Sequence, residues 1–312
     1  METRRDVVVR AAVLADELGY EVFSVAEGWG LDSTVVLAEL ALATRRITLA
    51  AGVLSVWGRS PATIAMAAAT LHRLSGGRFV LGLGASTRPL AVGWHDARCD
   101  RPAARLRAVT AGVRALLDGE RAVLSAVPTA RALRLGLPPG PEVPIWLAAT
   151  GERTLQVTAD LADGWYPLYL RPERVRELGA DLAARRVPPR PLTVAAGPFT
   201  VVDPDGAAAR EAVAASTAAY LVSMGDLYPR VVAAQGLAAE VDLVRSTGTV
   251  PPEAQLLLDE FTAHGTAARV REQLERWDDA ADVTMVGLPP GLPWDRIEAT
   301  LRAAAPRPRS GG

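Results

Sequence analysis

The chain has 312 residues, 49 % of them hydrophobic, with 34 lysines and arginines against 35 acidic residues and a net charge of −1. This balance excludes a general nucleic-acid binder, which would carry a basic excess. No apolar run reaches the roughly eighteen residues of a membrane helix, and no apolar signal region follows Met1. We therefore expect a soluble, cytoplasmic protein without membrane contacts.

Two residue types are missing altogether, and their absence excludes several enzyme classes. The chain has no lysine and no asparagine, so all 34 basic residues are arginine. A Schiff-base lysine is therefore impossible, and so is the lysine of a phosphate-binding P-loop. With one cysteine, Cys99, and three histidines far apart in sequence, we expect neither an internal disulfide nor a metal site.

Helices and short apolar strands alternate along the chain. End signals such as Gly19 after the first helix and Ser60-Pro61 before the third support the helix boundaries. Residues 119–142 are rich in Pro and Gly and predict a loop or hairpin excursion. The predicted helices are 5–18, 33–44, 61–74, 101–117, 152–161, 172–186, a helical region at 207–246 broken around Gly225, 264–277 and 294–304. The predicted strands are 21–26, 47–53, 78–84, 143–149, 165–168, 192–202 and 283–287.

Strands that are apolar throughout and separated by helices predict a parallel sheet buried on both faces. Seven strand–helix units without a linker favour a closed (β/α)8 TIM barrel. An open, doubly wound sheet is the alternative. We expect one domain over residues 1–312, with a helical excursion at about 207–262.

In such a barrel the active site lies at the carboxyl ends of the strands. Small residues and tryptophans dominate these ends, which suits a flat aromatic cofactor. The only carboxylate is Glu27, which is either a general acid or substrate anchor, or a salt-bridge and capping residue. The turn at Thr150, Gly151 and Arg153 is either a phosphate site at a helix start or an ordinary strand–helix turn.

Several strings occur together in the order found in one enzyme superfamily. They are ADELGYEVFSVAEGWGLD at 15–32, TRRITLAAGV at 44–53, TLHRLSGGRFVLGLGAS at 70–86, PIWLAATG at 144–151 and ADLADGW at 159–165. Together they resemble the luciferase-like monooxygenase superfamily, and within it the coenzyme F420-dependent branch related to methylenetetrahydromethanopterin reductase. The resemblance covers residues 5 to 290 and implies a TIM barrel that transfers hydride.

The resemblance also implies positions for the site. Luciferases that use flavin carry a histidine pair where this chain has Glu27-Gly-Trp29, which favours the deazaflavin F420 over FMN. Glu27 is the expected catalytic residue, with Trp94 and His95 on the substrate side. The implied cofactor-binding residues are Gly52 and Val53, whose peptide is often cis in the family, together with Gly84, Ala85, Ser86, Thr150, Gly151, Arg153, Asp163, Gly164 and Trp165.

The resemblance carries two departures and leaves three functions open. Family members begin with a strand before the first helix, whereas this chain starts almost inside that helix, so either the given start is too late or the barrel lacks its first strand. The segment after Tyr220 is abbreviated near Val250-Pro-Pro252, in a region that commonly forms a lid or substrate wall in the family. The first hypothesis is an F420-dependent oxidoreductase that reduces an activated C=C or C=N bond of a small molecule. An FMN-dependent monooxygenase and a non-catalytic, degenerate barrel are the alternatives. The family implies a homodimer, and the arginine bias indicates a GC-rich, actinobacterial genome.

Overall fold

A computed structural model describes residues 2–122, 124, 129–137 and 142–306. Parallel strands alternate with helices, which confirms the α/β class predicted from the sequence. In order, the elements are α1 (Arg5–Glu17), β1 (Val22–Val25), α2 (Ser33–Ala43), β2 (Thr48–Ala51), β3 (Leu54–Ser55), α3 (Pro61–Leu74), β4 (Phe79–Gly84), η1 (Pro89–Trp94), α4 (Pro102–Leu117), β5 (Ile145–Ala148), α5 (Glu152–Leu161), β6 (Gly164–Trp165), α6 (Pro172–Arg185), β7 (Thr193–Ala196), β8 (Phe199–Val202), α7 (Gly206–Val222), α8 (Leu227–Val232), η2 (Ala233–Leu237), α9 (Ala238–Thr247), η3 (Pro252–Ala254), α10 (Gln255–Phe261), β9 (Thr262–Gly265), α11 (Ala267–Asp278), β10 (Val283–Thr284) and α12 (Trp294–Ala303).

The chain divides into two compact units. The sheet unit comprises Ser24–Pro167 and Gly179–Thr193, and the helical unit comprises Met1–Phe23, Leu168–Leu178 and Val194–Gly312. No helix in the described part of the chain is both long and apolar enough to cross a membrane.

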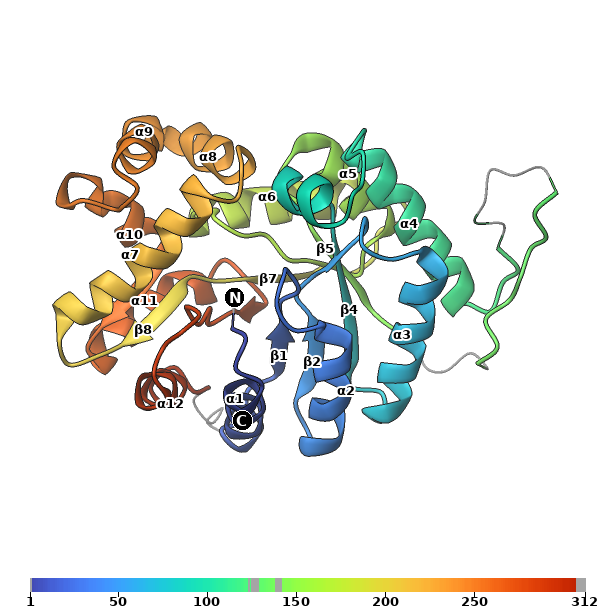
Figure 1. Cartoon of the computed structure of the whole chain (residues 1–312), viewed down its shortest axis with the longest axis horizontal. Helices are drawn as coiled ribbons and strands as arrows, with labels where there is room; N and C mark the ends of the chain where they lie inside the picture. Colours follow the sequence, from blue (N-terminus) through green and yellow to red (C-terminus); the bar gives the residue numbers. More distant parts are fainter. Residues whose placement is uncertain (1, 123, 125–128, 138–141, 307–312) are drawn as a thin grey trace. The chain divides into compact units, whose positions relative to one another are not determined.

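One face of the sheet in the sheet unit is built from large apolar side chains. β2 pairs with β4, β4 with β5 and β5 with β6, all in parallel. Directly paired residues point to the same side of a parallel sheet. Helices α2, α3 and α4 lie along this unit's strands (Figure 1). The large residues in matched register, each at most 1 % exposed, are Leu49, Phe79, Leu81, Ile145, Leu147 and Trp165.

The opposite face carries small residues, and this allows very close packing. The register aligns Gly82 with Trp146, and Trp146 with Gly164. A Cβ atom at Gly164 would run into the Trp146 ring, and one at Gly82 would run into the Ala51 carbonyl oxygen. The Trp146 indole therefore occupies space that Gly164 leaves free, while the Ala51 carbonyl and the Val53 side chain occupy the space beside Gly82. This small-residue face continues to Gly84 and Ala148 at the carboxyl ends of β4 and β5.

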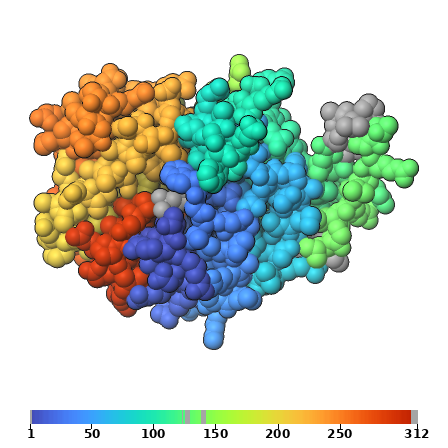
Figure 2. All heavy atoms as spheres, viewed as in Figure 1, coloured from blue at the N-terminus to red at the C-terminus, as the bar shows by residue number. Residues whose placement is uncertain are grey.

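Several helix boundaries follow from the sequence signals. Asp32 caps α2 by accepting hydrogen bonds from the Thr34 and Val35 amides, and Ser60 caps α3 ahead of Pro61. These are the side chains expected at helix starts. α5 has the predicted bounds. The described residues 129–137 project from the sheet unit (Figure 2), and an antiparallel bridge joins Ala122 to Leu133.

The prediction of one long strand at 192–202 is wrong. The chain forms β7 and β8, interrupted at Gly197 and Pro198. β7 pairs with β10, while β8 pairs with β9, a strand the sequence reading missed. Proline has no amide hydrogen to donate to a ladder, and the Met285 carbonyl oxygen packs against Gly197. The strand therefore changes partner at this dipeptide.

In the helical unit, helices α7 to α10 pack on a common core with β8 and β9. The centre of this core is an aromatic cluster around Tyr169, whose ring lies 5.2 Å from Tyr220, 5.5 Å from Tyr228 and 5.7 Å from Phe261. Burial raises the pKa of Tyr169 well above its ordinary value. The tyrosines here behave as core residues.

Two arginines bind several backbone carbonyls each. Arg78 donates to the carbonyls of Ala41, Thr44 and Ile47. Arg186 is 2 % exposed and donates to the carbonyls of Ala159, Ala162, Arg190 and Pro191. Each guanidinium thus satisfies carbonyls at a helix end and in the adjoining loop, which would otherwise be left without a partner.

Gly82→Ala tests the close packing of the small-residue face. The added methyl group must displace the Ala51 backbone, so we expect a loss of about 1–3 kcal/mol in the free energy of unfolding. Denaturant titration measures it. Gly206→Ala is the control, since nothing lies within 4 Å of a Cβ there. Equal stability of the two variants would contradict the packing described.

Candidate active site

The carboxyl ends of the strands in the sheet unit bring together most of the residues expected at the site. The peptide between Gly52 and Val53, at the end of β2, is cis, as the family resemblance implied. Val53 packs against Gly82 and Gly84 of the neighbouring β4. Gly84 is followed by Ala85 and by Ser86, which has a positive φ of 58°.

Two polar side chains that the sequence reading missed lie against this peptide. A Cβ at Gly52 would meet both Ser24 and Tyr166, so these residues contact it directly. The Tyr166 hydroxyl donates to Ser24 Oγ at 3.4 Å, and its ring meets Trp146 edge-on at 6.4 Å. Burial raises the pKa of Tyr166, although the hydrogen bond to Ser24 opposes this. Both residues lie at the ends of strands in the sequence, and that position could have identified them as candidates for the site.

The segment from Ser55 to Ser60 is held by side chains from three directions. Trp57 Nε1 donates to the Ala85 carbonyl at 2.8 Å. Arg105 Nε donates to the Val56 carbonyl at 3.0 Å, and its guanidinium lies 5.7 Å from the Trp57 ring centre. The ring of His95 packs against Gly58. These contacts fix the segment relative to the loop that follows β4.

Glu27 is part of an ion-pair network. Its Oε1 lies 2.6 Å from Arg59 Nη2 and accepts a hydrogen bond from Ser33 Oγ at 3.2 Å. The same Nη2 lies 2.9 Å from Oδ2 of Asp32. The Glu27 side chain is 10 % exposed and that of Arg59 is 18 % exposed. This geometry matches the salt-bridge alternative for Glu27, while leaving its second oxygen without a partner in the described residues.

The network favours the charged forms of Asp32 and Arg59. Burial opposes the charge of Asp32, but hydrogen bonds from Thr34 and Arg59 outweigh it and lower the pKa of Asp32. Burial likewise opposes the charge of Arg59, and the hydrogen bonds to Glu27 and Asp32 raise its pKa. Opposite charges in contact favour the ionised forms.

The turn after β5 offers free donors at the start of α5. Gly151 is the N-cap of α5 and supplies no side-chain acceptor. A Cβ atom at Gly151 would have only Thr154 Oγ1 near it, at 3.8 Å, so the space beside this glycine is open. Arg153 is exposed and makes no hydrogen bond or ion pair within the described residues. Glu152 is occupied by Arg185. Backbone amides at a helix start, with an unpaired guanidinium beside them, can bind an anion.

Asp163, Gly164 and Trp165, also expected at the cofactor, run from the residue before β6 to its carboxyl end. Asp163 accepts from the Ile145 amide at 2.8 Å and pairs with Arg114, which places it at the amino end of β5. Gly164 lies under the Trp146 ring. Trp165 is 0 % exposed, and its Nε1 donates to the Ala149 carbonyl at 2.8 Å. Asp163 is thus held at the amino end of β5, whereas the Trp165 indole reaches the residue that follows β5. Strand polarity was the available signal, since Asp163 precedes its strand.

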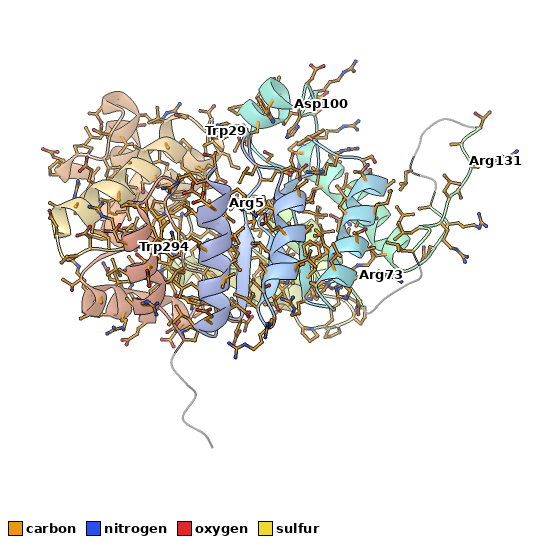
Figure 3. The ribbon with its side chains drawn as sticks, turned by 60° about the horizontal axis from the view of Figure 1, so that its bottom comes forward. Arg5, Trp29, Arg73, Asp100, Arg131 and Trp294 are labelled. Carbon is orange, nitrogen blue, oxygen red and sulfur yellow. The ribbon has the colours of Figure 1, made fainter. Side chains whose placement is uncertain are left out.

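The two substrate-side candidates differ in exposure. Trp94 ends η1 and is 60 % exposed, whereas the adjacent His95 is half-buried beside Gly58. A second exposed tryptophan, Trp29, is 54 % exposed. Trp29 and Asp100 lie at the end of the sheet unit opposite Arg73 (Figure 3). No cluster of metal-ligating side chains occurs among the residues that the structure describes.

Asp32→Asn isolates the charge of the network, because asparagine still caps a helix. Asp32 has a lowered pKa, so its charge stabilises the fold above the ordinary value of 3.8 and this contribution is lost as pH falls through the folded-state pKa. We expect the variant to be less stable at neutral pH, by under about 1 kcal/mol for so exposed a group. In acid, where Asp32 is protonated, the variant and the unsubstituted chain should be equally stable. Urea titrations at both pH values measure it, with the exposed Asp100→Asn as the control.

Comparisons with known proteins agree with this geometry. The chain is 32 % identical over 305 residues to a Mycobacterium tuberculosis protein provisionally named a coenzyme F420-dependent oxidoreductase, covering 87 % of each. It shares the fold of the F420-dependent tetrahydromethanopterin reductase from Methanopyrus kandleri (TM-score 0.75, 20 % identity, 97 % and 94 % covered). It also shares the fold of an F420-dependent secondary alcohol dehydrogenase in complex with an F420–acetone adduct (TM-score 0.78, 16 % identity, 97 % and 98 % covered). The family model for luciferase-like monooxygenases matches residues 2–283, and the chain belongs to that family.

Proposed function

We propose that the chain is an F420-dependent oxidoreductase, transferring a hydride between the deazaflavin and a small organic substrate. The observation that carries this is the 32 % identity, over 87 % of both chains, to the M. tuberculosis protein named for that activity. An activated C=C or C=N bond is the group that we propose is reduced.

The donor set after β5 suits the anionic side chain of F420. Thr150 and Gly151 bring the turn to the start of α5, whose first amides have no capping side chain. The guanidinium of Arg153 is unpaired in the described residues and adds a positive charge. Because Arg185 neutralises Glu152, that carboxylate opposes anion binding only weakly. We assign the cofactor's phosphate to this turn.

The ring system would lie at the ends of β2 and β4. Gly52, Val53, Gly84, Ala85 and Ser86 offer backbone and small side chains there, and all but Gly84 keep part of their surface exposed. A flat ring binds well over such a surface because no bulky side chain stands in the way. The chemistry that F420 supplies when bound is hydride transfer, and the chain orients it and excludes water.

Three residues are the candidates for the substrate side. Glu27 would anchor the substrate or exchange a proton with it, and its ion pair with Arg59 supports the anchoring role. Trp94 offers an exposed apolar ring, and His95 an imidazole that packs on Gly58. All three belong to the sheet unit.

A luciferase-like monooxygenase that uses FMN is the second candidate, supported by the name of the matched family. Fluorescence titration with F420 and with FMN separates the two. Tight F420 binding with weak FMN binding is expected. FMN preference together with oxygen uptake would replace the proposal with the monooxygenase, and binding of neither cofactor would favour a non-catalytic barrel.

Arg153→Ala locates the cofactor's anionic end. Losing one charge-assisted contact should weaken F420 binding about five- to tenfold. Arg131→Ala, in the projecting segment, is the control and should leave the affinity unchanged. Unaltered binding by Arg153→Ala would remove the α5 turn from the site.

We also propose a homodimer, as the family resemblance implies. Its interface would form on α2 and α3, which lie side by side in the sheet unit (Figures 1 and 3). Both helices expose large apolar side chains, and such patches on a soluble protein commonly mark interfaces. These are Val35 at 67 %, Leu42 at 76 %, Met66 at 58 % and Leu74 at 42 % exposure.

Leu42→Glu tests that interface. A charge in an apolar contact should shift the protein towards the monomer in sedimentation velocity, while the melting temperature of the isolated monomer stays unchanged. Leu133→Glu is the matched control, because Leu133 is 71 % exposed in the projecting segment. An unsubstituted chain that sediments as a monomer would contradict the dimer.

A further inference from the structure

We infer that Arg59 is a positioning residue, which holds one oxygen of Glu27 so that the other can accept a hydrogen bond from an O–H or N–H group of the substrate. This rests on the proposed function, since it places Glu27 in the active site. It deepens that proposal by naming both the residue that sets Glu27's role and the chemical feature that a substrate must carry.

The two carboxylate oxygens of Glu27 differ in their contacts. Oε1 is occupied by Arg59 Nη2 at 2.6 Å and by Ser33 Oγ at 3.2 Å. Oε2 has no hydrogen-bond partner in the described residues, and it is not among the fully buried atoms that lack one. One oxygen is therefore fixed by the protein and the other remains accessible. An ionised carboxylate only accepts hydrogen bonds, so a ligand at Oε2 must supply the donor.

The guanidinium of Arg59 also contacts a second carboxylate, that of Asp32. Arg59 Nη2 also contacts Asp32 Oδ2 at 2.9 Å, so both carboxylates lie within hydrogen-bonding distance of one nitrogen. Arg59 and Asp32 are the charged groups placed against Glu27 among the described residues, one from the segment after β3 and one from the cap of α2. Without the guanidinium between them, two carboxylates this close repel each other, and one of them takes up a proton.

The backbone around Arg59 is held in place by hydrogen bonds to two neighbouring parts of the sheet unit. Its segment is tied to the loop after β4 by the Trp57–Ala85 hydrogen bond and to α4 by the Arg105–Val56 hydrogen bond. Ser60, the next residue, caps α3. Asp32 is fixed in turn by the amides of α2. Glu27 is thus oriented from two rigid supports, which a flexible surface ion pair does not provide.

The experiment follows the side-chain carboxyl carbons of Glu27 and Asp32 by NMR in the full-length chain labelled with ¹³C, with and without F420. In Arg59→Gln we expect one of the two carboxyls to titrate at least about one pH unit higher than in the unsubstituted chain. Arg59→Lys should reverse most of this change in titration, since lysine keeps a positive charge at position 59. Arg131→Gln is the control for losing an arginine, and melting temperatures confirm that each variant folds.

A double variant separates positioning from a general effect on folding. Adding Glu27→Gln to Arg59→Gln removes one of the repelling carboxylates, so Asp32 should titrate lower again. Independent titration of Glu27 and Asp32 in Arg59→Gln would overturn the inference. These NMR titrations need no cofactor, so they test the role of Arg59 separately from the proposed function. If the proposed function were wrong, the chain would not bind F420, but the titrations of Glu27 and Asp32 would still be coupled.

Discussion

Close packing on the small-residue face is the constraint on which the sheet unit depends. The indole of Trp146 lies where Gly164 carries no side chain, and the Ala51 carbonyl lies where Gly82 carries none. Because β2 approaches β4 so closely, Val53 reaches both Gly82 and Gly84. The cis peptide before Val53 and the loop after Gly84 are therefore brought to one place. The site proposed here is a consequence of how near the strand ends can come.

A second property runs through the molecule, namely that every basic side chain is an arginine. A guanidinium has five donors in a fixed plane, whereas an ammonium is a point charge. The chain uses this geometry at Arg78, Arg186 and Arg59, where one side chain binds several acceptors. Two of these arginines stabilise backbone, and the third holds carboxylates at the candidate site.

Local signals account for what the sequence predicted well. Capping residues and proline placed the starts of α2 and α3, and the apolar strands predicted a parallel sheet. The cis peptide at Gly52 came from the family resemblance, since nothing in its own residues requires it. Contacts distant in sequence were not predictable in this way. Arg59 meets Glu27 across 32 residues and Tyr166 meets Ser24 across 142, so periodicity gives no sign of either pair.

The position of Asp163 and the division of the strand predicted at 192–202 both depend on contacts made in the folded chain. A resemblance assigns residues by position, but the polarity of a strand decides which end of the sheet they reach. Asp163 precedes β6 and therefore lies at the amino end, where Arg114 and the Ile145 amide occupy its carboxylate. The partner change at Gly197 and Pro198 depended on β9, whose pairing with β8 joins residues far apart in the chain.

The carbonyl-binding Arg186 has a consequence for how the chain can vary. Four carbonyls, two at the end of α5 and two in the loop after α6, depend on this one buried side chain. Next to it, Val187 is 92 % exposed. Adjacent positions thus carry opposite constraints, because the side chain of residue 186 is buried while that of residue 187 faces solvent. A bulky or polar side chain at position 187 would be tolerated with little effect on the fold, whereas a substitution one residue earlier would leave carbonyls at a helix end without their donor.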